Sequence, residues 1–144
     1  MKDILVIISN SIDFIVGLIC LLMAYKSIFS NKFLPFHEEA YGKSWETIDL
    51  KLQLVILTIM KISGLGFLVV GLLLIVSPIL NLLAMDPFSK FGVPAAAIIY
   101  SLGLFIFNYQ LYKKTNASTP WKGSMIIAIV VLFSLIILAV SEFL

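Results

Sequence analysis

Two ionisable side chains lie inside long apolar stretches of the sequence, and they are the first candidates for chemistry. Asp13 interrupts an apolar run that begins near Ile4, and Lys61 interrupts one that begins near Leu52. A carboxyl group and an amine inside a membrane can form a structural ion pair, or they can bind and release protons or a polar solute. The first alternative fixes the register of two helices, and the second makes a transport site.

A metal site or a nucleophile has weaker support. His37, Glu38 and Glu39 are metal-binding residue types, but adjacent residues on a helix point in different directions, and His37 is the only histidine. A solvated or interfacial face is the preferred interpretation of these three residues. Cys20 is the only cysteine and lies in an apolar run, as expected of a small buried side chain. We therefore expect no metal, no cofactor and no catalytic residue.

The elements that position these residues are predicted to be membrane-spanning helices. Hydrophobic residues make up 61% of the 144 and charged residues only 12%, whereas soluble domains are about 25% charged. A spanning helix needs roughly 20 mostly apolar residues, and its backbone must be hydrogen-bonded internally. Four windows satisfy these requirements: 4–25, 52–80, 93–112 and 121–140.

The connections between these windows favour a simple topology. Residues 26–51 form the only long polar segment, and residues 81–92 and 113–120 are short links. Short links make sequential helices antiparallel neighbours. The sequence thus predicts an all-α membrane protein, an antiparallel up-down-up-down four-helix transmembrane bundle, with residues 1–144 as a single domain. Pro94 is expected in the first turn of the third helix, where proline is tolerated.

Lysines near the ends of the spans predict the orientation, because positive charge accumulates in cytoplasmic loops. One side of the membrane carries seven lysines and the other carries Lys2 and Lys90. The seven are Lys26, Lys32, Lys43, Lys51, Lys113, Lys114 and Lys122. Both termini are therefore predicted outside, and the segments 26–51 and 113–120 are predicted in the cytoplasm.

The depths of Asp13 and Lys61 predict that they pair. Each lies nine residues into its span from opposite faces, or roughly 13–14 Å at about 1.5 Å per residue. Adjacent antiparallel helices would then place both side chains at the midplane. Small and polar residues on the same helix faces support close packing there. They are Asn10 and Gly17 on the first helix, Gly64 and Gly71 on the second, and Asn108 on the third.

The polar segment 26–51 is predicted to form a short amphipathic helix on the cytoplasmic face. Pro35 can open this helix, Gly42 can end it, and Asp49 can cap the second span. Its aromatic residues are spaced to lie on the lipid surface, with the charges toward water. These aromatic residues are Phe33, Phe36, Tyr41 and Trp45.

Four parts of the chain carry a resemblance: Phe33 to His37, Gly42 to Trp45, Leu52 with Gln53, and Ile59 to Gly64. Together they resemble small bacterial four-span membrane proteins of uncharacterised function. The resemblance implies a location in the bacterial inner membrane and transfers no activity.

Two functions from different classes are consistent with the sequence. The first is a membrane protein without enzymatic activity that acts as a scaffold, accessory subunit or modulator. The alternative is an oligomeric small-solute or proton-coupled transporter that uses Asp13 and Lys61. The expected partners are the lipid bilayer and either a second copy of the chain or another membrane protein. Nucleic acid is not expected, because no basic stripe alternates with aromatic residues.

Overall fold

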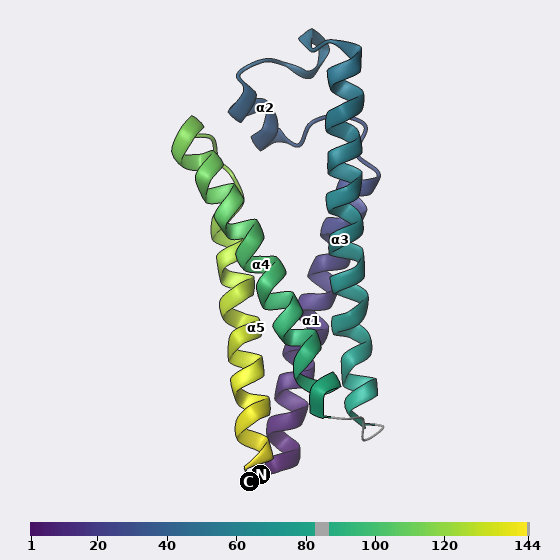
Figure 1. The fold of residues 1–144 in the computed structure, drawn as a ribbon, viewed down its shortest axis with the longest axis vertical. Helices are drawn as coiled ribbons and strands as arrows, with labels where there is room; N and C mark the ends of the chain where they lie inside the picture. Colours follow the sequence, from purple (N-terminus) through teal and green to yellow (C-terminus); the bar gives the residue numbers. More distant parts are fainter. Residues whose placement is uncertain (83–86, 144) are drawn as a thin grey trace.

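The computed structural model describes residues 1–82 and 87–143, and these residues form helices without any β-strand (Figure 1). The elements are α1 (Lys2–Ile28), α2 (Pro35–Tyr41), a 3-10 turn η1 (Trp45–Thr47), α3 (Leu50–Leu82), α4 (Pro87–Thr115) and α5 (Trp121–Glu142). Four of the helices are long and apolar enough to cross a membrane, and each contains one predicted span. The prediction of an all-α protein with four membrane-length helices is confirmed.

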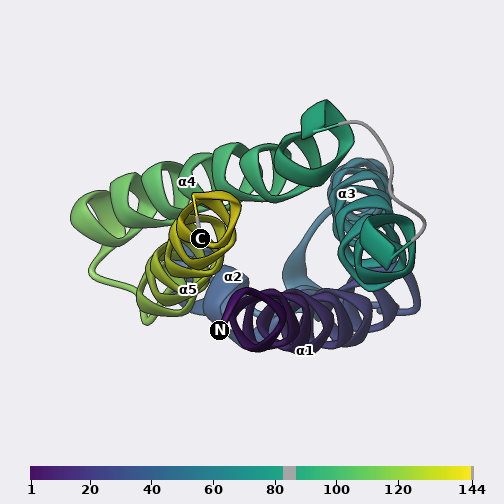
Figure 2. The same ribbon diagram turned by 90° about the horizontal axis from the view of Figure 1, so that it is seen from below.

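The four long helices form a ring in the order α1, α3, α4, α5, as the view along the bundle shows (Figure 2). The most extensive interface joins α1 to α3. Gly17 of α1 lies against Gly71 of α3, and Ser27 of α1 lies against Gly64. Residues later in α1 therefore contact residues earlier in α3.

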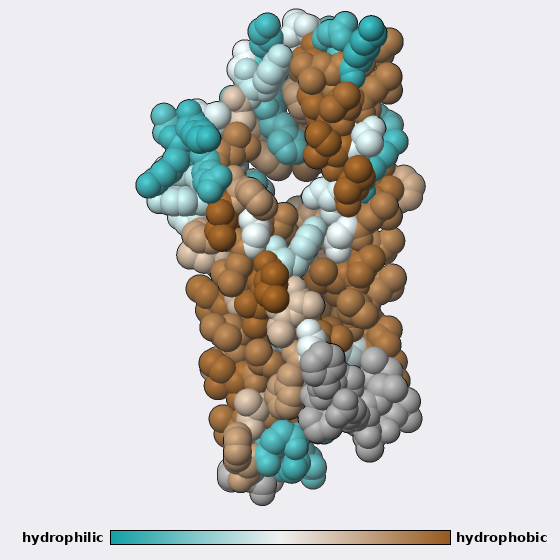
Figure 3. Space-filling model, viewed as in Figure 1, coloured by the Kyte–Doolittle hydropathy of each residue, from teal (hydrophilic) through white to brown (hydrophobic). Residues whose placement is uncertain are grey.

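The two ends of the bundle differ in how tightly the helices pack. At one end, called the terminal end here, the N-terminus and C-terminus lie side by side (Figure 1). At the opposite end, the loop end, the pair α1–α3 and the pair α4–α5 diverge, and α2 lies across the space between them. Hydrophilic residues gather mainly at the loop end, and a hydrophobic surface covers the middle of the molecule (Figure 3).

The third long helix begins earlier than predicted. It starts at Pro87, so Pro94 lies inside α4 and not in its first turn. A proline inside a membrane helix is tolerated when neighbouring helices and local adjustments satisfy the freed backbone groups. The helical ends of α3 and α4 also occupy much of the predicted link 81–92, of which residues 83–86 lie outside the described residues.

The polar segment folds largely as its turn chemistry predicts. Pro35 is the first residue of α2, and Gly42 ends the helix with a φ of 74°, a left-handed conformation that suits glycine. The carboxylate of Asp49 accepts a hydrogen bond from the backbone N–H of Lys51 at 3.0 Å, which caps the start of α3. Asn116, with a φ of 56°, follows the end of α4 in the same left-handed conformation.

Small and aliphatic side chains fill the core where the four long helices meet. The core cluster consists of Val16 and Cys20 from α1, Leu74 from α3, Ala97 from α4 and Val131 from α5. Cys20 is buried, as its apolar surroundings in the sequence predict. The interior is thus closed by short side chains, which let the helix backbones approach closely.

Candidate functional site

Asp13 lies in the interior of the bundle between α1 and α5. Asp13 is 1% exposed, and its carboxyl group lies beside the hydroxyl of Ser134. The hydroxyls of Ser9 and Ser134 lie 2.8 Å apart. Each of these hydroxyls also lies 3.1 Å from the backbone carbonyl oxygen of the other residue. Asp13, Ser9 and Ser134 therefore form one buried polar cluster, which we call the serine–aspartate cluster.

This cluster joins two helices that are distant in sequence. An interhelical hydrogen bond in a membrane contributes about 0.6 kcal/mol on average, so the reciprocal serine contacts hold α1 against α5 without a large energetic contribution. The carboxyl oxygen Oδ1 of Asp13 has no hydrogen-bond partner among the described residues. A buried polar atom without a partner is costly, so this oxygen is a position in the cluster that could accept a proton or a hydrogen bond.

The structure does not bring Lys61 to Asp13, so the predicted midplane ion pair is not formed. Lys61 is exposed on the surface of α3, and no ion pair joins it to Asp13 in the described residues. The reason is the register of α1 against α3. Gly17 packs against Ile75, which puts Asp13 near that level, whereas Gly64 packs against Ile28. Lys61 therefore lies near the level of Ile28, about 22 Å along the axis from Asp13.

The glycines predicted to support close packing do so, although not around an ion pair. A Cβ atom added at Gly17 would lie 2.9 Å from the carbonyl oxygen of Gly71, and one added at Gly71 would lie 3.0 Å from the carbonyl oxygen of Gly17. A Cβ added at Gly64 would lie 3.0 Å from Cβ of Ser27. These three glycines set the contact distance between α1 and α3.

The two predicted asparagines lie on α1 and α4. Asn10 is half-buried on α1. Asn108 is half-buried on α4, and its Nδ2 donates to the carbonyl oxygen of Leu104 at 2.9 Å, within the same helix. Asn108 thus finds its partner one helical turn away and does not reach the bundle centre.

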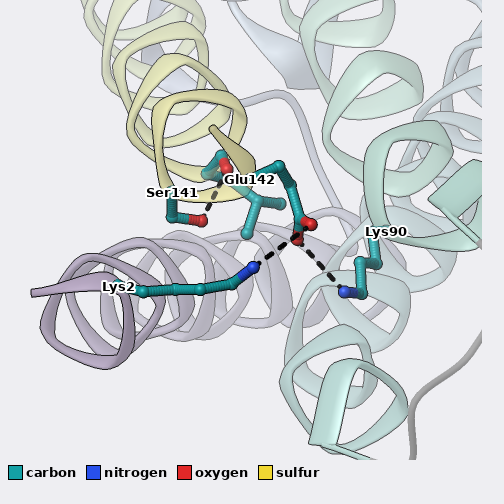
Figure 4. Close-up of polar contacts among 5 residues, drawn as sticks. Lys2, Lys90, Ser141 and Glu142 are labelled. Carbon is teal, nitrogen blue, oxygen red and sulfur yellow. Dashed lines mark hydrogen bonds and ion pairs between the residues drawn. The ribbon is translucent and has the colours of Figure 1, made fainter. Parts of the chain in front are cut away.

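An ion cluster at the terminal end was not predicted as a site. Glu142 at the end of α5 accepts contacts from Lys90 of α4 at 3.2 Å and from Lys2 of α1 at 3.7 Å (Figure 4). Three helix ends are therefore joined by one carboxylate. Exposed ion pairs contribute at most about 1 kcal/mol each, so this cluster assists the packing of that end and does not dominate it.

The loop end contains an apolar cavity under α2, which we call the loop-end chamber. Its volume is about 320 Å³. The lining residues come from the segment that carries α2, from α3 and from α4. They are Phe33, His37, Ala40, Tyr41, Ile56, Ile59, Met60 and Leu111. A gap in the surface between the two helix pairs is visible at this end (Figure 3).

Two of the four aromatic residues of the polar segment, Phe33 and Tyr41, line this chamber, whereas the sequence predicted that all four face lipid. Phe33 is 8% exposed. Its ring packs edge-on against Trp45 at a centroid distance of 4.9 Å and against Tyr41 at 6.1 Å. The prediction for Phe33 was wrong because helical spacing alone cannot tell a lipid-facing ring from one that covers a cavity.

His37 is one of the two residues of the chamber lining that carry a polar group. Burial lowers the pKa of its imidazole below 6.5, because desolvation disfavours the charged form. Its Nδ1 is buried without a hydrogen-bond partner among the described residues. Its sequence neighbours point elsewhere. Glu38 is exposed, and Glu39 accepts a hydrogen bond from the backbone N–H of Ser118 at 2.9 Å.

The contact between Glu39 and Ser118 links α2 to the connection between α4 and α5. The hydroxyl of Ser118 also lies 3.4 Å from the same carboxylate. His37, Glu38 and Glu39 consequently do not converge, and no group of three metal-binding side chains exists within residues 1–82 and 87–143. Glu39 instead attaches α2 to the connection between α4 and α5.

One signal in the sequence could have indicated the serine–aspartate cluster. On α5, the buried residues Ala128, Val131, Ser134, Leu138 and Ser141 recur every three or four positions. This spacing marks one helix face, and its two serines are the polar members. The ion cluster had no such signal, because Lys2, Lys90 and Glu142 come from three distant parts of the chain.

Comparisons with family models, curated proteins and solved structures found no match to this chain. The fold defines a helical protein with four helices able to span a membrane, packed tightly at one end and parted over an apolar chamber at the other.

Proposed function

We propose that the chain is a non-enzymatic accessory or modulator protein of the membrane, built as an antiparallel up-down-up-down transmembrane bundle. Its working part is the loop end. The observation that carries this proposal is that α2 covers an apolar chamber where the helix pairs diverge, and is attached through Glu39 to Ser118. An element held by a few surface contacts over a cavity can change position at low energetic cost.

The terminal half of the molecule is consistent with a function located at the loop end. The serine–aspartate cluster and the contact of Gly17 with Gly71 hold the helices together there. A rigid half and a loosely covered half are the parts that a modulator needs. The partner is another membrane protein or a second copy of the chain.

Photocrosslinking tests the accessory role. Benzoylphenylalanine replaces Glu38, which is exposed on α2, and in a control protein it replaces Asp3, which is exposed at the terminal end. After irradiation in native membranes and purification in mild detergent, we expect a discrete protein adduct from position 38 and not from position 3. A chain that runs alone as a monomer from both positions, and whose loss changes no other protein, contradicts the accessory role.

We also propose that the loop end faces the cytoplasm of a bacterial inner membrane. The seven lysines assigned to that side of the membrane belong to helix ends and connections at the loop end, whereas Lys2 and Lys90 contact Glu142 at the terminal end. In a Cys20→Ala background, an impermeant thiol reagent should label Asp3→Cys on intact cells and should leave Asn31→Cys unlabelled. The opposite labelling pattern would show that the orientation is reversed.

A second candidate function rests on Asp13. Its buried Oδ1 without a hydrogen-bond partner among the described residues is what a proton-coupled transporter would use. Lys61 has no part in it, because it lies on the surface. In proteoliposomes, Asp13→Asn should abolish proton-coupled flux if this function is present. No flux in the wild type, or the same flux in the variant, removes the transporter.

A further inference from the structure

We propose that the loop-end chamber is a binding site for an acyl chain of an anionic phospholipid. The inference rests on the proposed role of the loop end and names the molecule that occupies it. The first argument is the chemistry of the chamber wall. Isoleucine, methionine, leucine and aromatic side chains make up most of the lining, and His37 and the Tyr41 hydroxyl are its polar groups. Such a wall binds a hydrocarbon and offers little to a polar solute.

The size of the chamber decides between a lipid chain and a protein helix. An α-helix with its side chains is about 10–12 Å across and rises about 5.4 Å per turn. A single turn therefore occupies more than the chamber's 320 Å³. The same volume holds on the order of ten methylene-sized groups, taking about 30 Å³ for each, the share of one water molecule. A whole helical turn does not fit inside the chamber, whereas about ten carbons of an acyl chain do.

The position of the chamber gives the chain access from the bilayer. Ile59 lines the chamber and is also 61% exposed on the outer surface of α3. Because the wall at Ile59 is continuous with the lipid-facing surface, a chain can enter sideways without crossing water. The lipid headgroup then lies at the level of α2.

Charge selects an anionic headgroup at that level. Lys114 is exposed on α4, three residues after the chamber residue Leu111, and so lies close to the same face of the helix. Lys43 is exposed directly after the end of α2. Juxtamembrane lysines attract anionic lipids by about 1 kcal/mol each, and together these two are expected to favour an anionic over a zwitterionic headgroup by about thirtyfold.

Tryptophan quenching tests the proposal, because Trp45 packs on the chamber residue Phe33. A Trp121→Phe protein keeps Trp45 as the single reporter. It is reconstituted in unlabelled phosphatidylcholine with small fractions of phosphatidylglycerol or phosphatidylcholine that carry brominated chains. We expect brominated phosphatidylglycerol to quench Trp45 at about thirtyfold lower mole fraction and to reach saturation. Equal, non-saturating quenching by both lipids overturns the proposal.

Matched variants locate the site. Ala40 lines the chamber on α2, whereas Ala96 is exposed on α4. Ala40→Phe fills the chamber and should remove the preference for phosphatidylglycerol, while Ala96→Phe should retain it. Lys43→Gln with Lys114→Gln should make the two lipids equivalent, and Lys2→Gln at the terminal end should not. Retention of the preference in Ala40→Phe overturns the location.

Native mass spectrometry supplies a readout that does not depend on Trp45. The wild-type protein and Ala96→Phe should retain one phosphatidylglycerol each, and Ala40→Phe should retain none. Retention of one lipid by all three proteins places the site outside the chamber and overturns the proposal. The accessory role is judged separately by the adduct at position 38. A protein adduct without lipid selectivity overturns only the lipid site, and lipid selectivity without an adduct overturns only the accessory role.

Discussion

Replacing Gly17 by alanine should separate α1 from α3, because the added methyl group meets the backbone of the neighbouring helix. The new Cβ would lie 2.9 Å from the carbonyl oxygen of Gly71 and 2.8 Å from Cγ1 of Ile75. The isoleucine side chain can rotate away, but the carbonyl oxygen belongs to the backbone of α3 and cannot. An ordinary contact begins near 3.4 Å, so the two helices must move apart by about half an ångström.

The energetic result of Gly17→Ala follows from two opposing effects. Overpacking a well-packed interface costs about 1–3 kcal/mol. Alanine also favours a helix over glycine by up to about 1 kcal/mol, which reduces the net loss. Gly103 on α4 provides a matched control, because a Cβ added there has no neighbour within 4 Å. Gly103→Ala therefore gains helix propensity alone, and the two variants should differ by about 1–3 kcal/mol.

The assay is the free energy of unfolding in mixed detergent micelles for the wild type and both variants. Gly71→Ala, whose Cβ would lie 3.0 Å from the carbonyl oxygen of Gly17, should resemble Gly17→Ala. The double variant should lose less than the sum of the single losses, because one separation of the helices relieves both contacts. If Gly17→Ala is as stable as Gly103→Ala, the close approach of α1 and α3 is refuted.

Three further predictions concern the charged groups. Burial holds the pKa of His37 below 6.5 when α2 is docked. As pH falls below 6.5, His37 is therefore protonated more readily when α2 is undocked, and docking weakens. Trp45 fluorescence should report this change, and His37→Phe should remove it. Glu142→Gln removes two ion pairs and should destabilise the protein by no more than about 2 kcal/mol, an effect that high salt abolishes; a loss that persists in high salt contradicts a solvated ion cluster. Asp13→Leu and Lys61→Met should be additive within about 0.5 kcal/mol in unfolding experiments; coupling of about 1 kcal/mol or more would restore the midplane pair.

The elements of the fold could be predicted because each depends on a local property of the sequence. Apolar length predicts the four long helices, and every predicted span lies within one of them. Pro35 and Gly42 predict the ends of α2 because their backbone preferences are intrinsic to the residue. Asp49 caps α3 for the same reason. Pro94 could not be placed in this way, because α4 continues through it where neighbouring helices pack against the chain.

The register of α1 against α3 could not be predicted, and the candidate site depended on it. Depth in the bilayer was counted from predicted span ends, and α3 is 33 residues long, more than a bilayer requires. The excess length lets Lys61 lie far from the midplane while the glycines determine which turns meet. Gly17, Gly64 and Gly71 were identified as close-packing residues, but their spacing along the chain does not specify which of them meet. Close backbone approach specifies register more strongly than the attraction of two charges across lipid.

Side-chain size along the bundle explains why one half is tight and the other half is open. In the tight half, the interior positions are small, as at Ser9, Gly17 and Ser134. Toward the loop end, Tyr100 packs against Gly66 and donates to the carbonyl oxygen of Ser63 at 3.2 Å. Beyond that contact α3 and α4 diverge.

Large rings then fill the interface between α4 and α5 near the loop end. Trp121 packs against Tyr109 at 5.3 Å and against Phe105 at 6.2 Å. Those rings pack α4 against α5. They do not contribute to packing between α4 and α3 at this level. The chamber is therefore a consequence of where the small and large residues stand in the sequence, and α2 covers the apolar surface that the two helix pairs cannot bury in each other. Enlarging Gly66 should widen the chamber, and shortening Tyr100 should narrow it.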